Sequence, residues 1–295
     1  MAEGVEKYIF CRPFCVGMIP KTDRMEELYM NRIKRGLWII GLMICVCVWI
    51  FSAYSIYEYL SEAEQRGQEF AELAEMVDDT QNTKSKDEKG NGGASEQERY
   101  EDGMLSKYLA LHNQNKDMVG WISIEGTVIN YPVMHTPENP DFYLKHNFEK
   151  EYSDYGVPYV AGNCQLNPRS DNIIIYGHHM KNRTMFGALT EYADKDFYEK
   201  HKIIRFDTLT EQAEYEIVAV FKTTVYDGNG FAFYEFVDAE SEKEFQEYIR
   251  KCKELSLYDT GVSAEYGDEL LTLSTCEYSS KNGRMVVVGR ISTIF

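Results

Sequence analysis

Residues 271–292 read LTLSTCEYSSKNGRMVVVGRIS, and the interpretation of the whole chain starts from this stretch. Two apolar runs rich in β-branched residues flank a polar segment that ends in Asn-Gly at 282–283, a common turn signal. The pattern predicts a β-hairpin whose two strands pair antiparallel. Such pairing makes Cys276, at the end of the first strand, a neighbour of Arg284, at the start of the second.

Similar short apolar runs, bounded by Gly, Pro, Asn and Asp, recur from residue 119 to the C-terminus. Eight such strands with turn signals between them predict a mainly β domain, either a sandwich or a closed barrel. Two helices are expected beside them, at the start of the domain over 98–115 and over 240–256, where apolar residues recur on one helical face. The expected strands are VGWISI (119–124), VINYPVM (128–134), VPYVA (157–161), NIIIYG (172–177), KIIRF (202–206), YEIVAVFKTTVY (215–226), LLTLST (270–275) and RMVVVGRIS (284–292).

A long apolar run lies near the N-terminus, where residues 36–57, GLWIIGLMICVCVWIFSAYSIY, carry no charge. As a helix this run spans roughly 33 Å, which is enough to cross a hydrocarbon core of about 30 Å. A cleavable signal peptide has a shorter apolar region and a small-residue cleavage site, so we expect an uncleaved membrane anchor. Arg32, Lys34 and Arg35 precede the run and acidic residues follow it. The positive-inside rule then places the N-terminus in the cytoplasm and the rest of the chain outside.

Composition divides the chain into four parts. Residues 58–97 begin with a helical pattern that ends at about residue 78. The stretch that follows has almost no apolar residues, which is typical of a flexible linker. The expected parts are a cytoplasmic segment (1–35), a transmembrane signal anchor (36–57), a juxtamembrane helix with a flexible linker (58–97) and a globular catalytic domain (98–295).

Charge and cysteine content exclude several classes of function. The net charge of −17 argues against a nucleic-acid partner, because phosphate binding needs basic patches. Seven cysteines scattered over 295 residues do not form the dense pattern of a disulfide framework. Cys11 and Cys15 have a poor spacing for a metal site and lack a downstream partner pair. The sequence also contains no HExxH, P-loop or GxGxxG motif, so we expect neither a metal nor an organic cofactor.

The hairpin residues and a histidine from another strand could together form a catalytic site. A cysteine nucleophile needs a base that is adjacent in space, and His178 and His179 end the apolar strand NIIIYG. Neighbouring residues on a strand point to opposite faces, so at most one of the two faces Cys276. Arg284 keeps its charge at ordinary pH and could stabilise a thiolate or an oxyanion. From the residues alone, a Cys–His–Arg site and a core cysteine beside a surface arginine remain equally open.

TLSTC followed by an arginine, with YGH on an earlier strand, resembles the signature of sortases, the membrane-anchored cysteine transpeptidases of Gram-positive bacteria. The segments VGWISIEGTVINYPVM, ENPDFYLKHNF and IIIYGHHMKNRTMFGAL are similar to class B sortases in particular, as is the helix at 240–256. The resemblance extends along about 190 residues. It implies a closed eight-stranded sortase-type β-barrel with an N-terminal helix and a helix before the last two strands, preceded by one transmembrane helix.

The resemblance implies a role for each matching residue. Cys276 would be the nucleophile, His178 the general acid/base, and Arg284 the ligand of the substrate and the oxyanion. Ser274 and Thr275 would shape the strand beside the nucleophile and contact the substrate. Only the first histidine of the pair matches the family position, and strand alternation is expected to turn the second away from Cys276.

The resemblance also implies an activity, partners and a location. The enzyme would cleave a C-terminal sorting motif of secreted proteins, with NPxTN-like letters, and join the threonine to an amine of the cell-wall peptidoglycan precursor through a thioester. It would sit in the cell membrane with its catalytic domain outside. Two alternatives remain open. One is a membrane-anchored cysteine peptidase in which water replaces the amine, and the other is a surface binding module without turnover.

Overall fold

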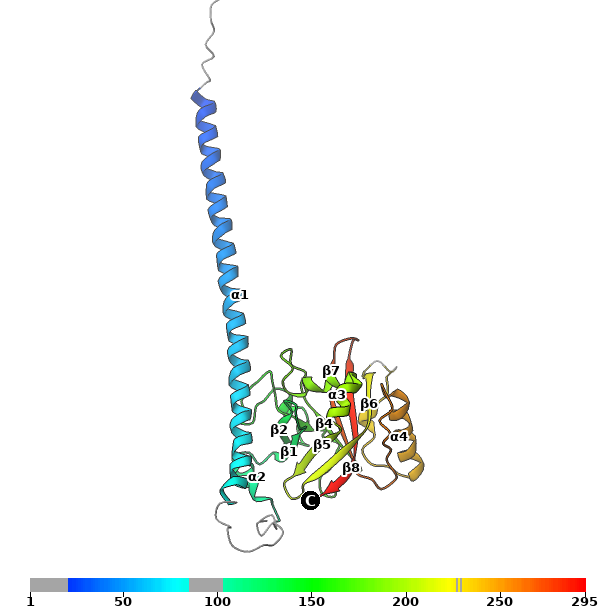
Figure 1. Cartoon of the computed structure of the whole chain (residues 1–295). Coiled ribbons are helices and arrows are strands. Elements are labelled where there is room, and N and C mark those ends of the chain that lie inside the picture. Colours follow the sequence, from blue (N-terminus) through cyan, green and yellow to red (C-terminus); the bar gives the residue numbers. More distant parts are fainter. Residues whose placement is uncertain (1–20, 85–102, 227, 229) are drawn as a thin grey trace, which may run out of the picture. The chain divides into compact units, whose positions relative to one another are not determined.

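The computed structural model describes residues 21–84, 103–226, 228 and 230–295 of the chain. Contacts between residues divide the chain into two compact units, Met1–Glu64 and Gln65–Phe295. All the strands of the structure belong to the second unit, as the colours along the chain in Figure 1 show.

Eight strands close into a barrel in the order β1-β2-β3-β4-β7-β8-β6-β5. The ring closes because β1 pairs antiparallel with β2 on one side and with β5 on the other. This closed barrel confirms the expected fold class, and each predicted apolar run overlaps one strand. The strands are Met118–Ser123 (β1), Asn130–Met134 (β2), Tyr159–Val160 (β3), Asn172–Tyr176 (β4), Ile203–Thr208 (β5), Ala213–Thr224 (β6), Leu270–Glu277 (β7) and Gly283–Ile294 (β8).

The strand β7 lies between two partners of opposite direction. It pairs in parallel with β4 and antiparallel with β8. Both β4 and β7 are buried along nearly their whole length, which is why residues 173–175 of β4 are continuously apolar and do not alternate. The 3-10 helix η2 (Phe186–Ala193) packs against β7 and β8. The strand end that carries Cys276 is therefore held by a well-packed sheet.

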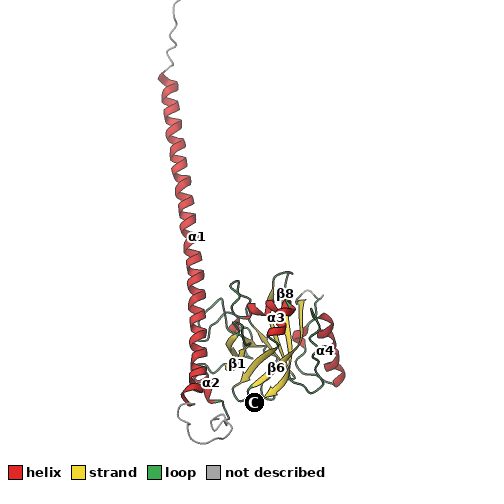
Figure 2. Cartoon of the chain, in the orientation of Figure 1, coloured by secondary structure: helices red, strands yellow, loops and turns green. Residues whose placement is uncertain are grey.

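The predicted helix before the last two strands is present as α4 (Glu242–Leu255). Ser241 caps its N-terminus by accepting a hydrogen bond from the backbone N–H of Glu244. The buried face carries Phe245, Ile249 and Cys252, so Cys252 is a core residue, and the helix packs against β6 on the outside of the barrel (Figure 2). The remaining short helices are α2 (Ser106–Gln114), η1 (Phe142–Leu144), α3 (Lys195–Lys200) and η3 (Phe233–Glu235).

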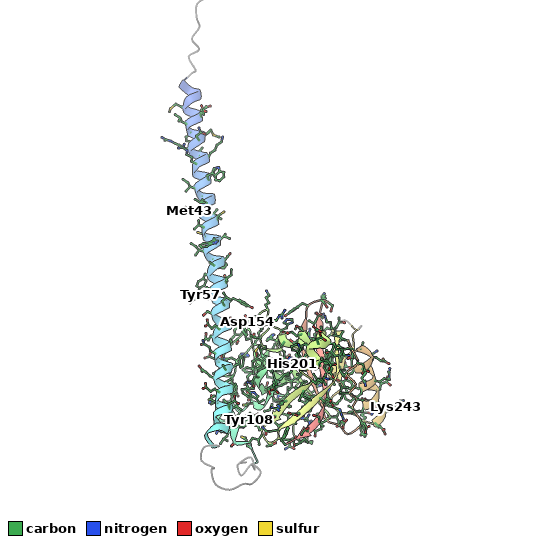
Figure 3. The ribbon with its side chains drawn as sticks, viewed as in Figure 1. Met43, Tyr57, Tyr108, Asp154, His201 and Lys243 are labelled. Carbon is green, nitrogen blue, oxygen red and sulfur yellow. The ribbon has the colours of Figure 1, made fainter. Side chains whose placement is uncertain are left out.

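The first unit contains most of the long helix α1 (Lys21–Lys84). Almost all side chains of its apolar stretch are exposed, including Met43 at 62% and Tyr57 at 69%, both labelled in Figure 3. Among the described residues, α1 is the one helix long and apolar enough to cross a membrane. Exposed apolar surface of this extent marks contact with lipid or protein. The helix is thus a candidate membrane anchor.

The C-terminal part of α1 belongs to the second unit and packs on the barrel. Phe70, Leu73 and Val77 lie on one helical face and are buried, at 6%, 4% and 6% exposure. The ring of Phe70 meets the ring of Tyr131 in β2 edge to face, with centroids 5.0 Å apart.

This packing places the domain boundary differently from the sequence-based expectation. The unit that holds the barrel begins at Gln65 instead of residue 98. The helix α1 also continues to Lys84, where a linker was expected from residue 79. From residue 85 to 97 the expected linker lies outside the described residues.

Candidate active site

Cys276 and Arg284 are direct cross-strand partners in the β7–β8 ladder, as the hairpin pattern predicts. The connecting turn uses Asn282 in the left-handed region, with φ of 57°, a conformation that asparagine tolerates. Glu277 ties the turn to the barrel. Its carboxylate accepts hydrogen bonds from the backbone N–H and the hydroxyl of Ser279, and from Lys222 Nζ at 3.1 Å. These bonds fix the hairpin on the C-terminal side of the cysteine.

The parallel pairing of β4 with β7 brings the histidine segment to the same place. The last pair in this ladder is Tyr176 with Ser274. His178 follows Tyr176 by two residues and Cys276 follows Ser274 by two residues, so the two lie at matching positions just past the ladder. The register therefore gathers His178, Cys276 and Arg284 at one end of three adjacent strands.

Gly177 permits this approach. A Cβ atom at Gly177 would lie 2.5 Å from Cγ of the Phe186 ring, a distance at which something must shift. The backbone is also tied to β7 on both sides. Gly177 N donates to Ser274 O at 3.2 Å, and Thr275 Oγ1 donates to Gly177 O at 2.8 Å. A side chain at position 177, directly before the histidine, would therefore clash with the Phe186 ring.

His178 is held by a backbone carbonyl. Its Nε2 lies 2.6 Å from the carbonyl oxygen of Leu144, at the end of η1. A carbonyl oxygen only accepts, so Nε2 carries a hydrogen, and Nδ1 of the neutral ring is left as the basic nitrogen. Burial lowers the pKa of His178 below its usual value, against the opposing effect of the Leu144 carbonyl. The contact with Leu144 therefore orients the ring and leaves Nδ1 as the nitrogen that can accept a proton.

His179 does not turn away from Cys276, contrary to the expectation from strand alternation. Its Nδ1 lies 2.8 Å from the carbonyl oxygen of Cys276. The alternation fails because β4 ends at Tyr176, so the two-residue period no longer governs the residues beyond it. The Tyr278 ring packs on the His179 ring with centroids 4.9 Å apart, and the Tyr278 hydroxyl donates to the His179 carbonyl at 3.3 Å.

Ser274 and Thr275 point into the protein. Their exposures are 1% and 2%, and the Thr275 hydroxyl donates a hydrogen bond to the carbonyl of Gly177. Ser274 Oγ is buried without a hydrogen-bond partner among the described residues. The structure thus gives these two side chains a place in shaping β7. Contact with a substrate stays a prediction that their burial does not support.

The guanidinium of Arg284 is available to a ligand. It is half-buried, and its Nη1 donates to the carbonyl of Gly283 at 3.0 Å. Within the described part of the chain no carboxylate lies at ion-pair distance from it. Arg290 on the same strand differs, because Glu216 and Asp268 lie 3.3 and 3.9 Å from its guanidinium. An uncompensated cation beside a thiol can hold an anion that forms there.

The other described cysteines lack these surroundings. Cys164 and Cys252 are buried, and burial raises the pKa of the first thiol to about 11 and of the second to about 12. Cys45 and Cys47 lie on the exposed apolar stretch of α1. Among the described cysteines, Cys276 alone is partly exposed and placed beside a histidine segment and an arginine.

The comparisons with known proteins agree with this geometry. A family model described as Sortase domain matches residues 122–292. A protein named Sortase B from Staphylococcus aureus is 32% identical over 262 residues, covering 88% of this chain and 98% of that protein. The chain belongs to the sortase family, in class B. A second Sortase B, from Listeria monocytogenes, is 36% identical over 187 residues, which is 62% of this chain and 73% of that protein.

Solved structures show the same fold for this sortase. The structure of a Staphylococcus aureus sortase B-substrate complex superposes with a TM-score of 0.65 at 31% identity. The superposition covers 79% of this chain and 98% of that one. The protein is thus a cysteine transpeptidase with the sortase-type barrel, as the sequence resemblance implied.

Sequence reasoning missed three features of this site. The partner of His178 is a backbone carbonyl, and a carbonyl leaves no signature in the residue types. The contact of His179 with Cys276 contradicts the alternation rule on which the expectation rested. The Tyr278 contact could have been suspected only from its position two residues after the cysteine.

Proposed function

We propose that this sortase cleaves a sorting signal in secreted proteins and transfers the new acyl end to an amine, with Cys276 as nucleophile. The observation that carries the proposal is the register of β4, β7 and β8, which sets His178, Cys276 and Arg284 at one end of three adjacent strands. A cysteine needs a neighbouring base and a stabilised oxyanion for acyl transfer. These three side chains offer both.

In the acylation step, the Cys276 thiolate attacks the carbonyl carbon of a threonine in the sorting motif. A carbon–sulfur bond forms, and the carbonyl electron pair moves to oxygen, where the Arg284 guanidinium faces the new negative charge. The carbon–nitrogen bond then breaks, and protonated His178 gives its Nδ1 proton to the leaving amine. Leu144 keeps Nε2 occupied during this step, so the proton travels through one defined nitrogen.

In the transfer step, an acceptor amine attacks the thioester carbon and His178 Nδ1 takes the amine proton. The tetrahedral adduct collapses by breaking the carbon–sulfur bond, which restores the thiolate and leaves a new amide. We propose an amine of the cell-wall peptidoglycan precursor as acceptor and an NPxTN-like sequence as the sorting motif, both from the class B family. A structure of the Staphylococcus aureus sortase B in complex with its substrate supports substrate binding by this barrel.

We further propose that residues 36–57 anchor the protein in the cell membrane with the barrel outside. The support is the exposed apolar surface of α1 and the basic residues Arg32, Lys34 and Arg35 on its N-terminal flank. This topology places the barrel on the side where secreted proteins and wall precursors meet.

The test uses the full-length protein in detergent micelles with a fluorophore–quencher peptide that carries NPxTN-like letters. We expect cleavage with the acceptor amine joined to the product, as mass spectrometry would show. Cys276→Ala and His178→Ala should abolish turnover, and Cys45→Ala is the matched cysteine control that should keep it. Release of only the free acid, even with the amine in excess, would support the peptidase alternative. Absence of turnover together with a Cys276 that resists thiol reagents would support the binding module.

A further inference from the structure

The ladder between β4 and β7 ends in an unusual way, because a side chain replaces a backbone donor. In a parallel ladder, hydrogen bonds to one strand recur at every second residue. Gly177 N donates to Ser274 O, so the next bond in the series would join the N–H of residue 179 to the carbonyl of residue 276. The structure makes this connection with the ring of His179, whose Nδ1 lies 2.8 Å from the Cys276 oxygen.

The ring that makes this bond is confined by two neighbouring residues. The Tyr278 ring packs on it at 4.9 Å between centroids, and the Tyr278 hydroxyl donates to the His179 carbonyl. Gly187 also lies close to the ring, since a Cβ atom there would lie 3.3 Å from His179 Cδ2. Each of the two segments therefore contributes one side-chain donor to a backbone carbonyl of the other. Together these contacts join the histidine segment to the cysteine segment beyond the end of the sheet.

We propose that His179 is a positioning residue, which holds the carbonyl of Cys276 and so fixes the direction of the thiol toward His178. The proposal rests on the proposed function, because it assumes Cys276 as nucleophile. A bond to the carbonyl fixes the peptide plane that follows Cys276, and with it the backbone rotation that aims the side chain. Without the bond, the described contacts that join the two segments at this end are the Thr275 hydroxyl on Gly177, before Cys276, and the Tyr278 hydroxyl on His179, after it. Small displacements of a reacting atom, of about 1 Å, cost on the order of 100-fold in rate.

A hydrogen-bond donor at His179 can be distinguished from an acid/base group by substitution. A carbonyl acceptor needs an N–H at the position of Nδ1, two bonds from Cβ. The amide nitrogen of asparagine lies two bonds from its Cβ, so asparagine can supply this donor without a titrating ring. Alanine removes the donor altogether. If His179 only positions Cys276, asparagine rescues the reaction, whereas a proton-transferring ring cannot be replaced in this way.

The structure offers a matched control in His201, labelled in Figure 3. His201 also places Nδ1 on a backbone carbonyl, that of Glu125, at 2.8 Å. The two histidines therefore make the same type of bond at the same length, but His201 has no contact with the residues of the proposed site. Removing this bond measures how much the loss of a purely structural histidine changes the reaction rate.

The experiment measures kcat and KM for the full-length protein in micelles, with the peptide and amine used above. We expect His179→Ala to lower kcat on the order of 10- to 100-fold with little change in KM, and His179→Asn to recover most of the loss. Tyr278→Phe should give a smaller decrease, and His201→Ala should leave both constants near wild type. Thermal unfolding would show that each variant is folded before its rate is compared.

Two results would overturn the inference. Wild-type kcat in His179→Ala would show that the bond does not position the nucleophile. Equal losses in His179→Asn and His179→Ala would show that the ring itself, and not the donor, is required. The proposed function fails in a different way, through an inactive wild type or an active Cys276→Ala, so the two failures are distinguishable.

Discussion

Replacing Arg284 by lysine keeps the positive charge of the site and removes its geometry. The guanidinium is half-buried beside Cys276, and its recorded hydrogen bond goes to the carbonyl of the adjacent Gly283. Its planar fork can direct two parallel N–H groups at one oxyanion or at a substrate backbone, whereas a lysine ammonium acts as a compact point charge. The substitution therefore separates bidentate binding from simple electrostatic attraction.

The expected magnitude follows from what the side chain does in each state. Its loss should change the free energy of unfolding by under about 0.5 kcal/mol, because it supports no ion pair within the described residues. The loss of one oxyanion donor, in contrast, costs on the order of 100- to 1,000-fold in turnover, or about 2.7–4 kcal/mol. We expect a fall of this size in peptide cleavage for both Arg284→Lys and Arg284→Ala, with thermal unfolding unchanged.

The control lies on the same strand. Arg290 is roughly 20 Å from Arg284 at ~3.3 Å per residue, and it pairs with Glu216 and Asp268. Arg290→Lys should leave turnover within about twofold of wild type, because the ion pairs can be kept and the site is distant. Near-normal turnover in Arg284→Lys would remove the guanidinium from the chemistry and leave a Cys–His pair.

Two further predictions concern pH and topology. Because burial lowers the pKa of His178, the unfolded chain binds a proton that the folded chain does not, in the range just below the ordinary value of about 6.5. Stability relative to His178→Gln should therefore fall as the pH drops from 7 to 5.5 in urea unfolding, and a constant difference would contradict the burial. Protease added to intact, wall-stripped cells should remove the chain from residue 58 onward, and protection of the barrel would contradict the outward orientation.

Much of the barrel was predictable because its strands are short apolar runs bounded by turn residues. The hairpin of β7 and β8 formed in the expected register, since the Asn-Gly turn and the two apolar runs specify it locally. The choice of a closed barrel over a sandwich, and the order of strands within it, came from the family resemblance. Periodicity does not encode which distant strands pair, as β4 and β7 do.

The packing of α1 on the barrel shows where local patterns stop being informative. Phe70, Leu73 and Val77 have helical spacing, but three apolar residues on one face of an otherwise acidic segment are weak evidence for burial. The partner of Phe70 is Tyr131, which lies on a strand far along the chain. The sequence-based boundary at residue 98 differs from the start of the contact unit at Gln65 for this reason. The contact that determines it is tertiary, whereas the boundary was drawn from composition.

The position of β7 between β4 and β8 has a consequence for the order of folding. The hydroxyl of Thr275 bonds to Gly177 across 98 residues of sequence, and the second partner of β7 is the last strand of the barrel. Contacts of such long range form late, because the intervening chain must first lose its loop entropy. A chain whose synthesis stops before residue 270 has open edges at β4 and β6 and lacks Cys276, the proposed nucleophile. Reactivity of the thiol therefore arises together with closure of the barrel, and a partly folded sortase has no assembled site with which to attack neighbouring polypeptides.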